Sequence, residues 1–281
     1  MTPPRGNDIQ AFINEALSLL QAAEHLDAAP AVRLIIENSF LGLDQLLYKH
    51  IARNAVAWTN VAVRLQSAVI FRVAMAHVVG RFHLQGKNGI NKELLKGQSN
   101  GELLMRFAAR KANELMNEKF RIERLMMDYY PSRMHHPQAA GDERPPVRET
   151  YTNDIYLWMA LTLVRQYFAS AMLSNMHHRA SDGGAYLYQS VGASNEEYLR
   201  KDVLERFHAQ FAMSAEGKEK LYMAVVFVKD AMRKVVKPLL VDHSLINRRP
   251  EGPWPRYLTC CEIADDELPW LAEKSQAEHG S

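Results

Sequence analysis

The sequence predicts a mainly α-helical fold that contains one short β-strand. Apolar residues recur at helical spacing through most of the chain, and breaks rich in proline or glycine separate the periodic stretches. The exception is "NVAVRL" at 60–65, where Val61, Val63 and Leu65 alternate with other residues. Alternation with period two is typical of a strand, because successive side chains point to opposite faces. A lone strand is unstable in water, so this one needs a partner.

The composition is that of an ordinary globular protein. The 281 residues are 47% hydrophobic and 23% charged, with a formal net charge of +2, so the overall charge demands no nucleic-acid partner. No apolar run approaches the roughly 18 residues that span a bilayer, and no signal-peptide pattern opens the sequence, so we expect no membrane association. The adjacent cysteines Cys260 and Cys261 indicate reduced thiols and a cytoplasmic protein. They are too few for a thiolate zinc site, and we expect no metal and no other cofactor.

The N-terminal part, residues 1–54, is expected to be a helical hairpin. Helical spacing runs through 8–27 and again through 31–53, and the break between them lies near Pro30. Two such helices joined by a short connection pair antiparallel.

Residues 55–130 are expected to hold the strand and two helices. After the strand, helical spacing returns from Ala68 to about Gln85 and is broken by "GKNG" at 86–89. A second helix is expected over 97–130, where Ser99 and Glu102 have the spacing of a capping box.

The rest of the chain is expected to divide into three parts. Residues 131–150 contain four prolines and few apolar groups, as a linker or loop does. Helical, strongly apolar spacing fills 151–240. Residues 241–281 read as an irregular tail that becomes acidic, with six carboxylates and one lysine from Tyr257 onward.

Two segments resemble the ribbon-helix-helix family of DNA-binding proteins. "NVAVRL" resembles the strand of that family, and "GQSNGELLMRFAARK" at 97–111 resembles the opening of its second helix. The gap from Leu65 to Gly97 is about twice as long as in compact members, which implies an insertion. The resemblance implies a homodimer in which two strands pair antiparallel and enter the major groove of double-stranded DNA, about 12 Å wide.

This resemblance assigns two sets of DNA contacts. The outward side chains of the strand, Asn60, Ala62 and Arg64, would contact bases, with Arg64 suited to guanine and Asn60 to adenine. At the start of the second helix, Ser99, Asn100 and Gly101 would offer backbone N–H groups to a phosphate.

The order of segments is also similar to that of the AcaB-type regulators of conjugative plasmids and integrating conjugative elements. The segment that carries this resemblance most clearly is "NDIYLWMALTLVRQYFASAMLSNMHHR", which ends in His177 and His178. The resemblance implies a transcriptional activator of conjugation genes, not an enzyme, that binds its operator or promoter as a homodimer. RNA polymerase or other regulators would be its protein partners.

Three alternatives stay open. Residues 56–85 are also compatible with one buried helix in place of the strand. Arg72 and His77 have the Arg-x4-His spacing of HEPN ribonucleases, in which such a pair contacts the scissile phosphate. The chain is also compatible with a helical, non-catalytic subunit of a nucleic-acid complex.

Histidine spacing gives little reason to expect a metal site. Glu205 and His208 have the i, i+3 spacing of half a di-iron site, but a second Glu-x-x-His is missing. The pairs at 135–136 and 177–178 are adjacent, and adjacent side chains on a helix diverge by about 100°.

Overall fold

A computed structural model describes residues 9–98, 100–134, 148–174, 180–193, 198–247 and 255–271. Throughout these ranges the regular structure is helical, and no strand occurs in them. The mainly α prediction is therefore confirmed, and the prediction of an embedded strand is wrong. None of the helices described is long and apolar enough to cross a membrane.

The chain forms two compact units. Unit 1 consists of Met1–Leu115 together with Val241–Ser281, and unit 2 consists of Met116–Leu240. The boundary falls within the long helix α7, Gly101–Asp128. The domain boundaries expected from the sequence stay a prediction.

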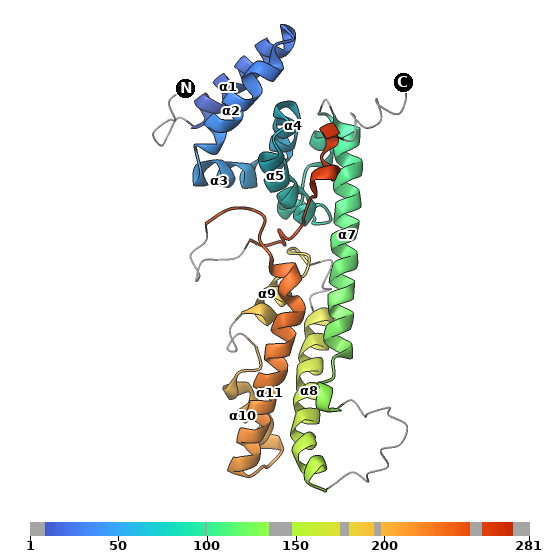
Figure 1. Cartoon of the computed structure of the whole chain (residues 1–281). Coiled ribbons are helices and arrows are strands. Elements are labelled where there is room, and N and C mark those ends of the chain that lie inside the picture. Colours follow the sequence, from blue (N-terminus) through green and yellow to red (C-terminus); the bar gives the residue numbers. More distant parts are fainter. Residues whose placement is uncertain are drawn as a thin grey trace. The chain divides into compact units, whose positions relative to one another are not determined.

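Unit 1 begins with two helices that pack against each other (Figure 1). Asp27 lies in the turn between them, with a φ of 55°, and Pro30 occupies the first turn of the second helix, where its missing N–H costs no hydrogen bond. The rings of Phe12 and Phe40 meet edge to face with centroids 6.1 Å apart. The helices of unit 1 before α7 are α1 (Ile9–His25), α2 (Ala29–Leu41), α3 (Gln45–Arg53), α4 (Ala55–Leu65), α5 (Ala68–Arg81), the 3-10 helix η1 (Gly86–Asn88) and α6 (Lys92–Lys96).

The stretch predicted as a strand is the second half of α4. Trp58, Val61, Ala62 and Leu65 are all buried, and their spacing of three, one and three residues belongs to one side of a helix. Because α4 packs against α2, α3, α5 and α6, it is buried on most sides and carries apolar residues nearly everywhere. Period-two alternation then appears by coincidence within a helical apolar run.

A turn separates α4 from α5. Gln66 ends α4 in the left-handed conformation, with a φ of 53°. The Ser67 hydroxyl caps α5 by accepting a hydrogen bond from the backbone N–H of Ile70. The alternative of a single buried helix over 56–85 is thus nearer to the observed structure than the strand is, but two helices occupy that range.

The C-terminal segment, 255–271, packs against α5 and α7 within unit 1 (Figure 1, in red). The indole of Trp270 meets the Phe71 ring edge to face at 5.6 Å, and Arg72 donates to the Ile263 carbonyl at 2.9 Å. Gly80 permits close approach of the segment, because a Cβ there would lie 1.9 Å from the Leu258 carbonyl oxygen. The 3-10 helix η5 (Asp265–Glu267) lies near the end of the segment.

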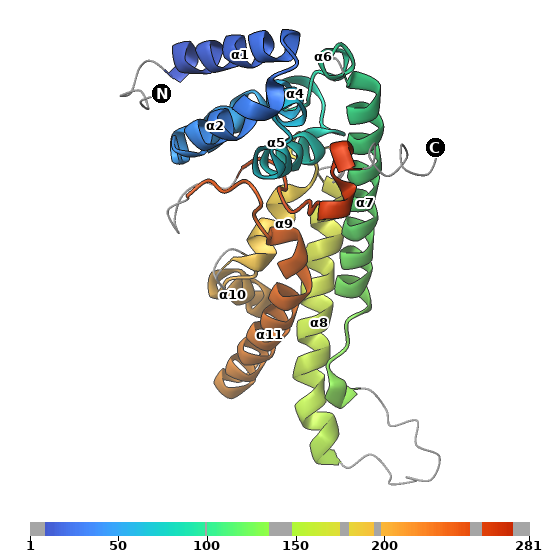
Figure 2. The same cartoon turned by 45° about the horizontal axis from the view of Figure 1, so that its top comes forward.

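Unit 2 is built around two long helices, α8 and α11, that pack side by side (Figures 1 and 2). Two buried lysines satisfy backbone carbonyl groups that would otherwise lack a hydrogen-bond donor. Lys119 donates to the Gly183 carbonyl at 2.8 Å, and Lys229 donates to the Tyr198 carbonyl. Besides the end of α7, the elements of unit 2 are the 3-10 helix η2 (Ser132–Met134), α8 (Arg148–Ser174), α9 (Ala185–Gly192), α10 (Lys201–Gln210), α11 (Ala215–Val236) and the 3-10 helix η4 (Lys237–Leu240).

Candidate functional site

A pocket of about 200 Å³ lies between α10 and α11 in unit 2. Each helix contributes residues at positions i, i+3, i+4 and i+7, which share one face of a helix. The residues of this α10–α11 pocket are Lys201, Leu204, Glu205 and His208 from α10, with Ala215, Lys218, Glu219 and Tyr222 from α11.

Residues at the N-terminal ends of α10 and α11 favour the start of each helix where it is observed. Ser214 is the N-cap of α11, and its hydroxyl accepts a hydrogen bond from the Gly217 backbone N–H at 3.1 Å. Asp202 lies in the first turn of α10, where a carboxylate interacts favourably with the helix dipole, and it is paired with Arg200. The four residues 211–214 connect the two helices. This short connection brings the two lining faces together.

The rim of the pocket carries balanced charge. Lys201 and Lys218 supply two cations, and Glu205 and Glu219 supply two carboxylates. None of these four groups is in an ion pair within the described ranges. The Lys201 ammonium lies over the Tyr222 ring, 5.7 Å from its centroid. The pocket can therefore offer both a positive and a negative contact to a bound group.

Two of the residues that line the pocket, Leu204 and His208, are buried. Leu204 is almost fully buried, and His208 is 7% exposed. Nδ1 of His208 is buried without a hydrogen-bond partner among the described residues, and the ring contacts that of Phe207 edge to face. Leaving such an atom unsatisfied costs about 1–3 kcal/mol.

Three of the side chains that line the pocket, Glu205, His208 and Glu219, are of types that can bind metal ions. Glu205 and His208 do share a face, but no group of three or more histidine, cysteine or acidic side chains suited to a metal ion occurs among the described residues. The Glu-x-x-His spacing noted in the sequence is therefore not completed to a metal-binding group within the described ranges.

The residues predicted to contact DNA bases lie in α4, and one of them is inaccessible. Ala62 is fully buried, and Asn60 is half-buried. The Arg64 guanidinium forms a bidentate ion pair with Glu24, with N–O distances of 3.1 and 2.8 Å. Their predicted contacts depended on a strand, and the same residues lie in α4 instead.

The residues predicted to contact phosphate lie at the start of α7, apart from Ser99, which is outside the described residues. The Asn100 carbonyl accepts the hydrogen bond from the Leu104 backbone N–H at 2.9 Å. Gly101 is buried, and a Cβ there would lie 1.9 Å from the Lys96 carbonyl oxygen. Close packing onto the end of α6 therefore explains this glycine without a ligand.

The residues of the ribonuclease alternative, Arg72 and His77, both contact the C-terminal segment. Arg72 pairs with Asp265 in addition to its bond to the Ile263 carbonyl. His77 is 1% exposed, and its Nδ1 lies 3.0 Å from the Tyr257 hydroxyl. Holding this segment against α5 accounts for both residues.

Comparison with known families matches residues 131–238 to the FF domain, and specifically to its fungal branch. No curated protein matches the chain significantly, and neither does any solved structure. The matched region lies wholly within unit 2 and contains the α10–α11 pocket, although it covers less than half of the chain.

This match, with the helical α4, overturns the predicted resemblance to ribbon-helix-helix and AcaB-type proteins. A plasmid-encoded activator of conjugation is therefore the wrong class of protein. The homodimer loses its original argument as well, because α4 has no unpaired strand edge that requires a second copy.

Sequence reasoning singles out Glu205 and His208 but misses the other pocket residues, although a signal for them exists. "KDVLERFH" at 201–208 and "AEGKEKLY" at 215–222 both place charged, apolar and aromatic residues at positions i, i+3, i+4 and i+7. Such a mixed stripe is neither a plain core face nor a plain solvated face. Two mixed stripes separated by a short connection predict a polar-rimmed pocket.

Proposed function

We propose that the chain is a non-catalytic helical interaction subunit that binds a partner protein through the α10–α11 pocket of unit 2. The observation that carries the proposal is the FF-domain match over 131–238, which includes the pocket. FF domains are helical modules that bind other proteins, including phosphorylated peptides. Protein partners of the regulator class remain in keeping with such a role, whereas DNA readout does not.

The size and chemistry of the pocket fit one side chain of a partner. A volume of about 200 Å³ is smaller than the roughly 300–1,000 Å³ of typical small-molecule sites. The buried wall at Leu204 suits an apolar group, and the ring of His208 lines the same pocket. Lysine and glutamate side chains on the rim then contact the flanking residues of the bound segment. This is the usual arrangement of an apolar anchor with a polar rim.

A pair of neighbouring substitutions on α11 tests this proposal. Tyr222 lines the pocket, whereas Met223 is 57% exposed and is not among the lining residues. We expect Tyr222→Ser to weaken binding of the partner by at least about tenfold, because aromatic anchors at interfaces contribute about 1–3 kcal/mol or more. Met223→Ser should leave binding within about twofold of the wild type.

The measurement is quantitative affinity purification with the full-length chain, followed by titration of each captured protein against both variants. Circular dichroism melting curves check that both variants are folded. If every captured protein binds the two variants equally, the pocket is not the binding site and the proposal fails.

A further inference from the structure

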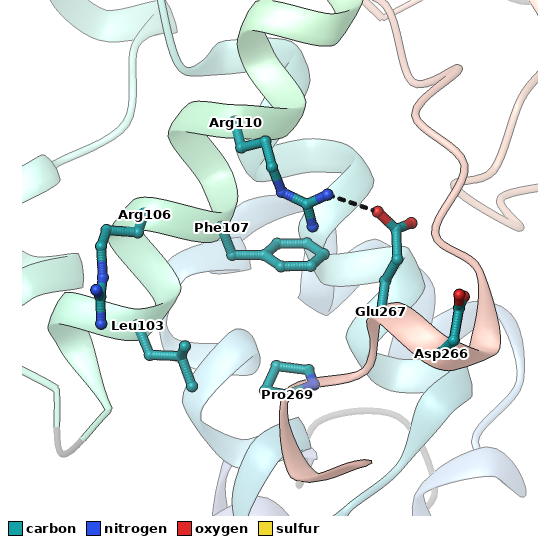
Figure 3. A pocket seen from close by; sticks show the side chains of 7 residues that line it. All are labelled: Leu103, Arg106, Phe107, Arg110, Asp266, Glu267 and Pro269. Carbon is teal, nitrogen blue, oxygen red and sulfur yellow. Dashed lines mark hydrogen bonds and ion pairs between the residues drawn. The ribbon is translucent and has the colours of Figure 1, made fainter. Parts of the chain in front are cut away.

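A second hollow, of about 650 Å³, lies in unit 1 between the first turns of α7 and the C-terminal segment (Figure 3). Its apolar floor consists of Leu103, Phe107 and Pro269. Phe107 and Pro269 are buried, and Leu103 is half-buried. We call this hollow the α7 groove. It lies outside the matched region 131–238 and is separate from the α10–α11 pocket.

The charges closest to the core of unit 1 neutralise one another. Glu267 accepts from Arg110 at 3.0 Å and from Lys111 at 2.7 Å, and Glu114 lies 3.6 and 3.0 Å from the same two cations. Burial alone would raise the pKa of Glu267, but hydrogen bonds from Lys111, the Ala264 backbone and Arg110 hold it below its ordinary value. This network attaches the C-terminal segment to α7. Because the charges of this network are paired with one another, they are not available to pair with a ligand.

The remaining two charges of the groove differ from this network. Arg106 and Asp266 line the groove, are exposed, and have no ion-pair or hydrogen-bond partner among the described residues. Figure 3 shows Arg106 on α7 at one side of the apolar floor and Asp266 on η5 at the other. The groove therefore has an apolar centre with an unpaired cation at one end and an unpaired carboxylate at the other.

This arrangement specifies the chemistry of an occupant. An apolar side chain that covers the floor would gain a free energy of about 25 cal/mol for each Å² of apolar surface buried. An acidic group would pair with Arg106, and a basic group with Asp266, so the occupant carries opposite charges on its two sides. A peptide segment carries apolar, acidic and basic side chains next to one another, so the fitting occupant is a segment of a partner protein.

We propose that the α7 groove binds a segment of a partner protein in which one large apolar residue is flanked by an acidic residue on one side and a basic residue on the other. Arg106 and Asp266 set the charge preference, and the apolar floor anchors the central residue. The groove thereby gives unit 1 a binding site of its own, independent of the role proposed for unit 2.

Peptide selection with the full-length chain tests this inference. The probe is a displayed library of seven-residue peptides with leucine fixed at the centre and the six other positions random. The wild type is expected to enrich peptides with an acidic residue on one side of the leucine and a basic residue on the other. Asp266→Arg should shift the enrichment to acidic residues on both sides, and Arg106→Glu to basic residues on both sides.

Matched variants separate the groove from general charge effects. Glu102→Arg changes the net charge as Asp266→Arg does, one turn from Arg106 but outside the groove lining, and it should keep the wild-type preference. Tyr222→Ser should keep it too, so that failure here and failure of the unit 2 proposal are distinguishable. Where a charge reversal unfolds the protein, Asp266→Asn replaces it and should lose the preference for the basic residue. An absence of enrichment, or enrichment that neither reversal alters, would overturn the proposal.

Discussion

Cys261 shows how its surroundings change the chemistry of a single residue. The thiol packs against the core of unit 1, and burial raises its pKa to about 12, although Lys111 opposes the shift. The thiolate is the reactive form of cysteine. A raised pKa means that the folded protein holds the proton more tightly than the unfolded chain, so thiolate is scarce at neutral pH.

We therefore predict that Cys261 is protected in the native protein. In a Cys260→Ser variant, a disulfide reagent at pH 8 should label Cys261 more than about a hundredfold more slowly in buffer than in denaturant. The native rate should rise with pH up to about 12, whereas the rate in denaturant should level off above about pH 9. Native and denatured rates within tenfold of each other at pH 8 would show that the fold does not raise the pKa of this thiol.

The partners of charged residues are the feature that the local sequence could not predict. The ribbon-helix-helix resemblance implies a DNA base as the partner of Arg64, and the ribonuclease alternative implies a scissile phosphate as the partner of Arg72. Each instead binds residues far away in the chain, Glu24 for the first and the Ile263 carbonyl for the second. Local spacing carries no information about such partners, because only the tertiary fold brings them together.

At the scale of elements, α5 and the C-terminal segment can approach closely because Gly80 has no side chain. A Cβ on Gly80 would lie 1.9 Å from the Leu258 carbonyl oxygen, closer than any real contact. Since that neighbour is backbone, the segment must move to accommodate any side chain.

Gly80→Ala is accordingly expected to destabilise unit 1 by about 1–3 kcal/mol, the usual cost of overpacking. Urea denaturation gives the free energy of unfolding, and hydrogen exchange should show faster exchange in the C-terminal segment, 255–263. Gly42→Ala is the matched control, because a Cβ there meets its nearest atom at 3.4 Å and Gly42 has helical dihedral angles. Equal stability of the two variants would argue against the close approach at Gly80.

The helices themselves are largely predictable, and α4 explains the main error. Amphipathic helices such as α1 and α7 expose one face, so their period is visible in the sequence. By contrast, α4 is surrounded by neighbours, so its polar positions are few and its period is obscured. A short apolar run of this kind does not distinguish a buried helix from a strand.

At the scale of the whole molecule, the two units offer different surfaces. Unit 2 holds the region similar to the FF domain and a pocket with charges of both signs. Unit 1 holds the C-terminal segment and the α7 groove. The sequence could not predict this division, because residues 241–271 join the N-terminal helices only through contacts that span most of the chain. Protein binding is the function that we propose for both surfaces.

Site-specific photocrosslinking tests the central claim, that the α10–α11 pocket binds a partner protein, most directly. A photoreactive phenylalanine analogue replaces Lys218, on the rim of the pocket, or Lys234, an exposed residue near the end of the same helix and outside the pocket. We predict that the probe at 218 crosslinks the partner isolated by affinity purification, that Tyr222→Ser abolishes the crosslink, and that the probe at 234 gives none. A crosslink of equal yield from both positions, or one that survives Tyr222→Ser, would contradict the claim.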